Sequence, residues 1–273
     1  MSYFQNDLTS VTLHLRPRKT NRVPKWLGRA AQALYYSSLH DIHPVIATAI
    51  HDAHGPKPFT ISNIIGAEND GDLTYLNPGH PVKLRLTTLH PHITAITHNT
   101  LLPNWNGTGI ELHGQPLRII ANAQPDHWSQ QTTFAALLDR APDCREVHMH
   151  FTSPTAFKST AGHHVPLPQP ELVFGSLFNR WNFFAPRRMS DAVSDSISKT
   201  IQCTKADVHT ETIKFARGNK GVISGFLGHV SFYISEQDSV IRRHIQALAA
   251  FALYSGIGVH TTVGMGQVKG SVA

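Results

Sequence analysis

Residues 255–269 read SGIGVHTTVGMGQVK and carry four glycines, arranged as two G-x-G pairs with five residues between them. Residues 240–254, just before this stretch, repeat apolar side chains at the spacing of an amphipathic helix, and a short strand is expected after it. Glycine tolerates backbone conformations that other residues avoid, and it lets a second backbone approach closely. The stretch therefore predicts a glycine-rich connection from the last helix of an α+β domain to its final strand.

The residues before this connection follow an order of elements that occurs twice in the chain. In the second half, strands are expected at residues 146–152, 208–215 and 222–234, with a helix at Pro170–Phe184 after the first of them. With the helix at 240–254 and the last strand, the order is strand, helix, two strands, helix, strand. This is the split βαβ order of a ferredoxin-like domain.

The first half of the chain shows the same order. A helix begins near residue 26 and is interrupted or restarted at Pro44, and a second helix covers residues 93–101. The strands are expected at residues 8–15, 57–65, 82–89 and 117–121. We therefore predict an α+β chain of two tandem ferredoxin-like (RRM-like) domains, residues 1–125 and 143–273, connected through residues 124–143. The duplication rests on the order of elements, because the halves lack obvious sequence identity.

The composition is that of a folded, moderately basic protein. Of its 273 residues, 41% are apolar, and 24 Lys plus Arg against 18 Asp plus Glu leave a net charge of +6. A basic excess of this size suits either a solvated surface or a nucleic acid partner. The 19 histidines are more informative, because imidazole transfers protons near neutral pH, binds metals and stacks on bases.

The cysteines and the apolar runs bear on the cellular compartment. Cys144 and Cys203 form no C-x-x-C pair, so we expect free, buried thiols in a reducing environment. The first residues, MSYFQNDLTS, lack a basic stretch followed by an apolar run, and no apolar run reaches the roughly 18 residues of a membrane span. These features predict a soluble cytoplasmic protein without a membrane partner.

Glycine pairs alone are weak indicators, because many mark only tight turns. The stretch at 255–269 differs from a dinucleotide-binding G-x-G-x-x-G, which follows a strand and opens a helix, and it lacks the G-K-[ST] ending of a P-loop. Its unobstructed backbone N–H groups suit a phosphate or a sugar. Between two ferredoxin-like domains, such a stretch would serve as a platform for RNA.

Four segments, in the same order along the chain, resemble one family. They are IHDAHGPKPFTIS at residues 50–62, FTSPTAFK at 151–158, PLPQPELVFGSLFNRWN at 166–182 and AAFALYSGIGVHTTVGMGQV at 249–268. Together they resemble the CRISPR-associated endoribonucleases of the RAMP superfamily, the sixth Cas family, which cut CRISPR repeat RNA. The resemblance implies cleavage without metal or other cofactor, in which a ribose 2′-OH attacks its own phosphate and leaves a 2′,3′-cyclic phosphate and a 5′-OH.

The resemblance also implies a catalytic set in the first domain. His51 matches the family's catalytic histidine, Lys57 its nearby lysine and Tyr36 its tyrosine, with Arg29 and His40 as reserve candidates for charge or proton transfer. From the residues alone, His51 suits a helix end, Lys57 an exposed strand edge and Tyr36 the packing of its helix. The implied roles are proton transfer for His51 and phosphate binding for Lys57.

The implied partner is CRISPR repeat RNA in its precursor transcript, with other subunits of a CRISPR effector complex as further partners. The residues expected to contact RNA are basic side chains near the matched segments and the glycine-rich stretch itself: Lys158, Arg187, Arg188, Lys214, Arg217, Lys220, Gly256, Gly258, His260, Gly264, Gly266, Gln267 and Lys269. We expect Gly258→Asp and Gly264→Asp to weaken RNA binding far more than folding.

Other interpretations stay open. One is a metal site made by His40, His43, His51 and His54, although Pro44 breaks their helical spacing and no carboxylate or cysteine completes a familiar zinc set. A second uses the H-x-T motifs at residues 92–94 and 150–152, which resemble those of two-histidine phosphoesterases, where both motifs lie on strands. A third is a RAMP-fold RNA-binding subunit that has lost catalysis and would not need His51.

Overall fold

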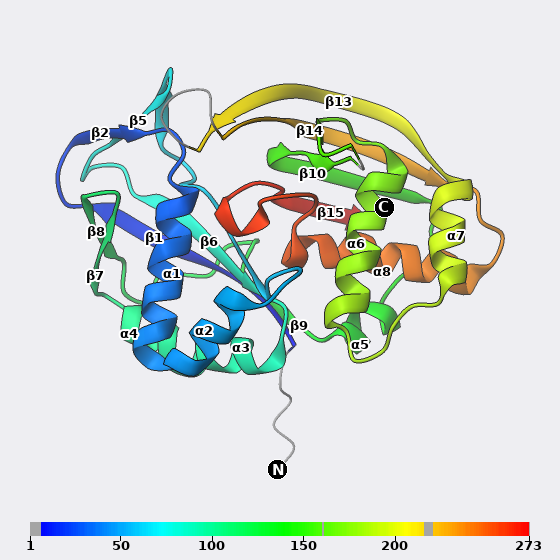
Figure 1. Ribbon diagram of the computed structural model, residues 1–273, viewed down its shortest axis with the longest axis horizontal. Helices are drawn as coiled ribbons and strands as arrows, with labels where there is room; N and C mark the ends of the chain where they lie inside the picture. The colour runs from blue at the N-terminus through cyan, green and yellow to red at the C-terminus, as the bar shows by residue number, and fades with distance from the viewer. Residues whose placement is uncertain (1–6, 160, 216–220, 273) are drawn as a thin grey trace, which may run out of the picture. The chain divides into compact units, whose positions relative to one another are not determined.

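The computed structural model describes residues 7–159, 161–215 and 221–272. The chain divides into two compact units (Figure 1), one of Met1–Gln131 with Thr262–Gly264 and the other of Thr132–Thr261 with Met265–Ala273. Three residues of the glycine-rich stretch thus group with the first unit. The predicted domains were residues 1–125 and 143–273, so the prediction had placed these three residues in the second domain. Among the described residues, no helix is both long and apolar enough to cross a membrane.

The first unit contains an antiparallel sheet in the order β3-β6-β1-β8-β7, with β9 also pairing with β1. Its strands are β1 (Leu8–Pro17), β3 (Phe59–Ile61), β6 (Val82–Thr88), β7 (Gly109–Leu112), β8 (Gln115–Ile119) and β9 (Gln130–Thr132). A separate small sheet, in the order β2-β5-β4, consists of β2 (Asn21–Pro24), β4 (Glu68–Asp70) and β5 (Leu73–Leu76). The helices are α1 (Gly28–Ile42), α2 (Pro44–Asp52), α3 (Pro91–Ile96), the π-helical turn η1 (Thr97–Leu101) and α4 (Leu102–Trp105).

The restart of the first helix at Pro44 has a local cause. Pro44 is the first residue of α2, where its missing N–H costs no hydrogen bond and its fixed φ suits the helix. Between α1 and α2, the backbone of His43 leaves the helical region, with φ −148° and ψ 78°. The chain therefore forms two helices in succession. The first of them, α1, is anchored in the unit's core by Tyr35, whose ring centroid lies 4.5 Å from that of Phe59.

The second unit repeats the arrangement. Its main sheet has the order β13-β14-β10-β15, formed by β10 (Glu146–Thr155), β13 (Ile201–Lys214), β14 (Val222–Ile234) and β15 (Val268–Val272). The helices are α5 (Phe134–Asp139), α6 (Pro170–Phe184), α7 (Asp191–Thr200) and α8 (Ser239–Ser255); a hairpin of β11 (Phe157–Lys158) and β12 (His164–Val165) and a 3-10 turn, η2 (Thr261–Val263), complete the list.

Both sheets place the four ferredoxin-type strands in the same order: second, third, first, fourth. In the first unit these strands are β3, β6, β1 and β8, and in the second they are β13, β14, β10 and β15. The prediction of an α+β chain with two tandem ferredoxin-like units is confirmed.

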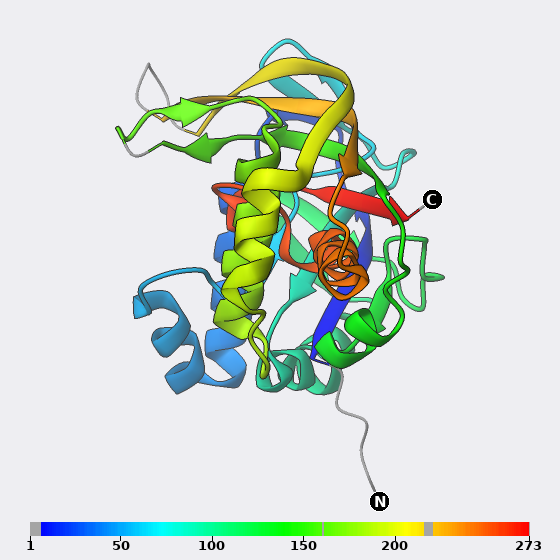
Figure 2. The ribbon, with the colours of Figure 1, turned by 90° about the vertical axis from the view of Figure 1, so that its right-hand side faces the viewer.

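The sheet of the second unit is covered on one face by its helices, and Figure 2 shows α8 along its axis beneath the strands. Residues that alternate along β10 and β14, such as Phe151, Val230 and Phe232, are buried, and Phe174 of α6 packs its ring 5.2 Å from that of Phe232. The residues between them are partly buried or exposed, and His150 and His229 are exposed. The period of two along these strands thus divides the side chains between core and solvent.

Several details differ from the expectations. The strand expected at 57–65 is limited to β3, the helix expected at 93–101 is a chain of α3, η1 and α4, and the connection at 124–143 carries β9 and α5. Helix α7 and the small sheet were not predicted. Both cysteines are free. Cys144 is only partly buried, and Cys203 is exposed on β13, which is an edge strand of its sheet. The expectation of buried thiols was therefore wrong.

Candidate active site and the glycine-rich stretch

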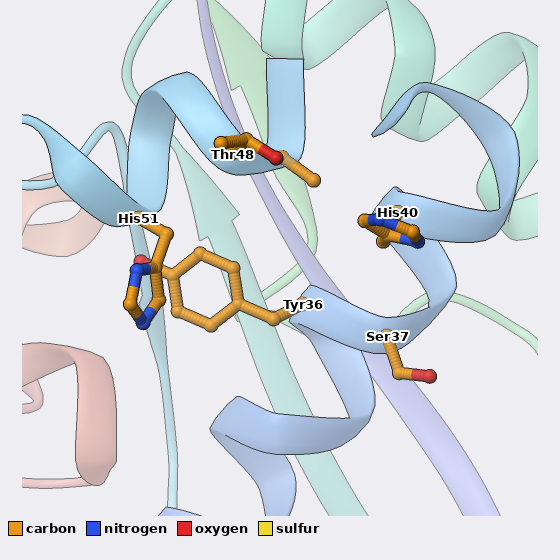
Figure 3. A pocket seen from close by; sticks show the side chains of 6 residues that line it. Tyr36, Ser37, His40, Thr48 and His51 are labelled. Atoms are coloured by element: carbon orange, nitrogen blue, oxygen red, sulfur yellow. The ribbon is translucent and has the colours of Figure 1, made fainter. Parts of the chain in front are cut away.

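The predicted catalytic residues of the first unit meet where α1 and α2 face each other. The ring of Tyr36 from α1 lies 5.6 Å from that of His51 from α2, at an interplanar angle of 73° (Figure 3). Its other neighbour is Phe59, 5.3 Å away. An open pocket of about 290 Å³ lies between these helices, lined by Tyr36, Ser37, His40, Ala47, Thr48 and His51.

His51 is presented to solvent at the last turn of α2. Its Nδ1 lies 3.1 Å from Oδ1 of Asp52, and both side chains are more than two-thirds exposed, at 73% and 71%. An exposed ion pair of this kind contributes little to stability. The imidazole therefore lies at the carbonyl end of a helix, which favours a positive charge, and it is accessible to a ligand.

Tyr36 is half-buried beside this imidazole. Burial raises the pKa of the Tyr36 phenol above its usual value. The phenol therefore stays protonated at neutral pH and is available as a hydrogen-bond donor. In this arrangement Tyr36 can stabilise developing negative charge, whereas His51 can move a proton.

Lys57 performs a structural task that the sequence did not reveal. Its Nζ donates to the carbonyl oxygens of Ile50, His51 and Ala53 at 2.8, 2.9 and 2.6 Å. An ammonium group has three N–H donors, so all three are directed at the C-terminal end of α2. The geometry makes Lys57 a residue that fixes the turn carrying His51, and phosphate binding by Lys57 stays a prediction.

The reserve candidates lie on the same helix as Tyr36. His40 is exposed and lines the cavity, and Arg29 is exposed in the first turn of α1. The four-histidine metal interpretation finds no support: within the ranges that the structure describes, no three or more His, Cys, Asp or Glu side chains gather as a metal site would require. Cleavage without metal stays a prediction.

The glycines of the second unit are needed by the protein's own backbone. Gly256, Gly258 and Gly266 have φ of 61°, 79° and 66°, a region that favours glycine. A Cβ at Gly258 would collide with the carbonyl oxygen of Ala156, and one at Gly266 with that of Ile257. Gly256 ends α8, with its N–H bonded to Ala252 O at 3.0 Å.

Arg180, a residue that the sequence analysis missed, holds this part of the stretch. From α6 its guanidinium donates to the carbonyl oxygens of Ser255 and Gly258, the latter at 2.7 Å, and to Thr261 Oγ1 at 3.0 Å. Burial lowers the pKa of Arg180 to about 10, which still leaves it charged at neutral pH. One turn earlier, Ser176 Oγ accepts from Gly258 N at 3.0 Å.

Thr262–Gly264 are held by residues of the first unit. Trp26 Nε1 donates to Val263 O at 2.8 Å, and Gln32 Nε2 to Thr262 Oγ1 at 2.9 Å. Gly264, with φ 104°, bridges to Ser62. A Cβ at Gly28 would collide with the carbonyl oxygen of Val263, so a glycine is required at the start of α1 as well.

The expectation that Gly258→Asp and Gly264→Asp would weaken RNA binding far more than folding disagrees with this packing. A Cβ at Gly264 would lie 2.8 Å from Asn63 N, and both glycines have positive φ. Gly256, Gly264, Gly266 and Gln267 are buried, Gly258 and Lys269 are partly buried, and His260 is exposed. Contact between these residues and RNA stays a prediction, and the conformation of the stretch is set by protein contacts.

The predicted basic residues are distributed over several elements of the second unit. Lys158 on β11, Arg187 and Arg188 after α6, and Lys214 at the end of β13 are all exposed. Arg217 and Lys220 lie outside the described residues. Trp181 Nε1 donates to Arg187 O at 3.2 Å, which fixes the loop that presents the two arginines.

The first H-x-T motif lies on a helix, as the helical spacing of its segment predicts, and this disagrees with the phosphoesterase interpretation. His92 lies on helix α3, whereas His150 lies on strand β10 in the other unit. Two such motifs must both lie on strands to direct their histidines into one cleft. His150 instead stacks on His229, with ring centroids 4.0 Å apart and an interplanar angle of 11°.

The fold of two tandem ferredoxin-like units is shared with solved Cas6 and RAMP proteins. A structure titled as an RAMP protein binding different RNA substrates matches with a TM-score of 0.60 at 16% identity, over 97% of this chain and 100% of that one. The family model of the CRISPR-associated endoribonuclease Cas6 matches residues 149–268. The resemblance to the sixth Cas family predicted from the sequence is confirmed.

The individual relatives agree with this family. Cas6 endoribonucleases of Mycobacterium tuberculosis H37Rv and Streptococcus thermophilus are 29% and 27% identical over 137 and 121 residues, which cover 50% and 44% of this chain. These matches span 42% and 48% of the two relatives, less than half of their length. A Thermus thermophilus Cas6 in a product complex has a TM-score of 0.80 at 24% identity, covering 97% of this chain and 100% of that one, and at this identity it shows the shared fold.

Proposed function

We propose that this protein is a metal-independent endoribonuclease that cuts CRISPR repeat RNA in the precursor transcript and produces guide RNAs. The observation that carries the proposal is the Tyr36–His51 pair, which lines an open cavity, with the end of α2 that carries His51 fixed by Lys57. The names of the relatives, CRISPR-associated endoribonuclease, support the reaction class. Structures titled as Cas6 product and substrate mimic complexes support RNA as the ligand.

The proposed reaction needs no water and no external nucleophile. The ribose 2′ oxygen loses its proton and forms a bond to phosphorus, while the bond from phosphorus to the 5′ oxygen breaks and that oxygen gains a proton. We assign a proton transfer at the scissile phosphate to His51, which is worth roughly 10²–10⁴-fold in rate. The protonated Tyr36 phenol donates a hydrogen bond to the phosphate oxygens as their charge grows.

We further propose that the exposed cations of the second unit and the glycine-rich stretch form the surface that binds RNA. Binding through several phosphates is expected to position the RNA without reading its sequence. Location in the cytoplasm and association with other CRISPR effector subunits belong to the same proposal.

The decisive experiment is incubation of the protein with the CRISPR repeat RNA of its source genome in EDTA, followed by end-group analysis. Cleavage that yields a 2′,3′-cyclic phosphate and a 5′-OH supports the proposal. A substrate with 2′-deoxyribose just upstream of the cut should bind normally and stay intact, and its cleavage would refute the mechanism. Tight binding of the unmodified RNA without any cleavage would identify the alternative, a RAMP-fold subunit without catalysis.

A further inference from the structure

An exposed pair of histidines lies on the second sheet, away from the helices that cover its other face. His150 of β10 and His229 of β14 are directly opposite each other, and their rings stack in parallel at 4.0 Å. Both residues are exposed. Parallel stacking of two solvent-exposed imidazoles is a surface on which a further flat ring can stack.

Strand register places charged residues on both sides of this pair. Lys269 of β15 is opposite His150, and Asp207 of β13 is opposite His229. Side chains of directly opposed residues lie on the same face of a sheet. The row Asp207, His229, His150, Lys269 therefore crosses all four strands, with its cationic end beside His150.

The first unit shows how the same kind of face can be closed. There Arg85 of β6 lies 4.8 Å from the ring of Trp128, and Asp126 binds Lys83 at 2.9 Å and Thr12 at 2.9 Å. The segment before β9 thus covers polar residues of β1 and β6, and Arg85 is only 2% exposed. In the second unit, Asp207, His229 and His150 are left exposed.

We propose that the exposed face of the second sheet binds an unpaired segment of RNA, with a base stacked on the His150–His229 pair and a neighbouring phosphate at Lys269. The proposal rests on the proposed function for the identity of the ligand. Aromatic faces beside a cation match the alternation of bases and phosphates in single strands. The carboxylate of Asp207 disfavours phosphate at the other end of the row, so the charge pattern sets a direction.

The site continues from the stretch already expected to contact RNA. Lys269 lies on β15, which directly follows the glycines, and Gln267 O accepts from Thr152 N at 2.8 Å beside it. Burial, followed by the proximity of His229 and Lys269, lowers the pKa of His150. The ring of His150 is therefore neutral at physiological pH, which favours close stacking on a base over repulsion within the pair.

Binding of a fluorescein-labelled oligoadenosine of about a dozen nucleotides, measured by anisotropy in EDTA, tests the site without requiring cleavage. Replacing both histidines by alanine should raise Kd about 10-fold or more, because base stacking is lost. The double His150→Phe, His229→Phe variant keeps aromatic faces and should bind within about 3-fold of wild type. His244→Ala, on helix α8, is the control and should leave Kd unchanged.

Two results would overturn the site: an alanine pair that binds like wild type, or a phenylalanine pair that binds as weakly as the alanine pair. Crosslinking of wild-type protein to a 4-thiouridine oligonucleotide gives a reading that does not depend on variant folding. We expect crosslinks within β10, β14 or β15, and crosslinks confined to other elements would contradict the proposal. If the site binds RNA but repeat RNA is not cut, the proposed function fails and this inference stands.

Discussion

At the scale of single residues, the site depends on how each side chain is held. His51 is exposed and lies beside the carboxylate of Asp52. Tyr36 is half-buried, and burial raises the pKa of its phenol. Lys57 donates hydrogen bonds to three carbonyl oxygens at the end of α2. Two residues of the same matched segment are therefore held differently: His51 is open to solvent, whereas Lys57 fixes the turn that carries His51.

His51→Ala should lower the single-turnover cleavage rate by roughly 10²-fold or more, because it removes the group assigned to proton transfer. Affinity for repeat RNA should change little, since many phosphate contacts hold the RNA. Rates measured at saturating protein decide the matter. His40→Ala and His54→Ala are neighbouring controls, and a larger loss in His40→Ala would show that the wrong histidine was assigned.

His150 makes a testable contribution to the pH dependence of stability. Its folded pKa is lowered by burial, His229 and Lys269, so between that value and the unfolded value of about 6.5 the unfolded chain binds more protons. Stability should therefore fall as pH falls through this window. Melting temperatures from about pH 7 to pH 5 should fall less steeply in His150→Phe than in wild type. His163→Phe should keep the wild-type slope, and equal slopes in all three proteins would contradict this assignment.

At the scale of elements, the C-terminal ends of two helices are each fixed by a cationic side chain that donates hydrogen bonds to backbone carbonyl oxygens. Lys57 satisfies the end of α2, and Arg180 of α6 satisfies carbonyls at the end of α8 and in the glycine-rich stretch. Unpaired carbonyls at helix ends are otherwise left to water. Each cation thus converts a helix end into a fixed backbone conformation.

Lys57→Met should lower the free energy of unfolding by about 1–3 kcal/mol, because three carbonyls lose a charged donor. Urea unfolding measures this change, and cleavage should fall with it because the turn that carries His51 is released. Lys57→Arg should restore part of both properties. Unchanged stability with a large loss of RNA affinity would instead show that Lys57 acts on a phosphate.

Arg180→Met should destabilise the second unit by about 2–4 kcal/mol, since buried carbonyls of Ser255 and Gly258 lose their donor. Below the melting temperature, the variant should also bind repeat RNA more weakly, because the glycine-rich stretch is no longer fixed. Ser176→Ala, which removes one acceptor from Gly258 N, should cost about 1 kcal/mol. If the Arg180→Met protein bound RNA with wild-type affinity, the conformation of the glycine-rich stretch would not matter for RNA binding.

At the scale of the whole molecule, the chain combines a net charge of +6 with exposed cations on several elements of the second unit. Binding by many dispersed phosphate contacts produces an affinity that falls steeply with salt. The candidate catalytic residues lie in the first unit and the basic set in the second, so substitutions in the two sets should separate cleavage from affinity.

A variant with glutamine at Lys158, Arg187, Arg188 and Lys214 tests this electrostatic proposal. If each cation neutralises one phosphate, the slope of log K against log salt should become shallower by about 3. A control with glutamine at Arg16, Arg18, Lys19 and Lys199, four exposed cations outside the predicted set, carries the same charge change. Equal slopes for the two variants would indicate a nonspecific effect of net charge.

The sequence by itself determined the ferredoxin-type order of the main strands and helices, the α+β class and the candidate residues. Period-two alternation marked β10 and helical spacing marked α6 and α8, because these signals depend on neighbours a few residues apart. The glycine pairs were also visible, since positive φ is a local demand. Proline at position 44 marked the break between the two helices of the candidate site.

Only the tertiary structure decided what holds these parts in place. The hydrogen bond from Trp26 to Val263 O joins residues far apart in the chain, as do those from Arg180 to Gly258 O and Thr261. No local pattern distinguishes Arg180 from a solvated arginine or Lys57 from an exposed one. Their partners are backbone carbonyls, which every residue carries, so the pairing follows from the path of the folded chain and not from the identity of the partner side chain.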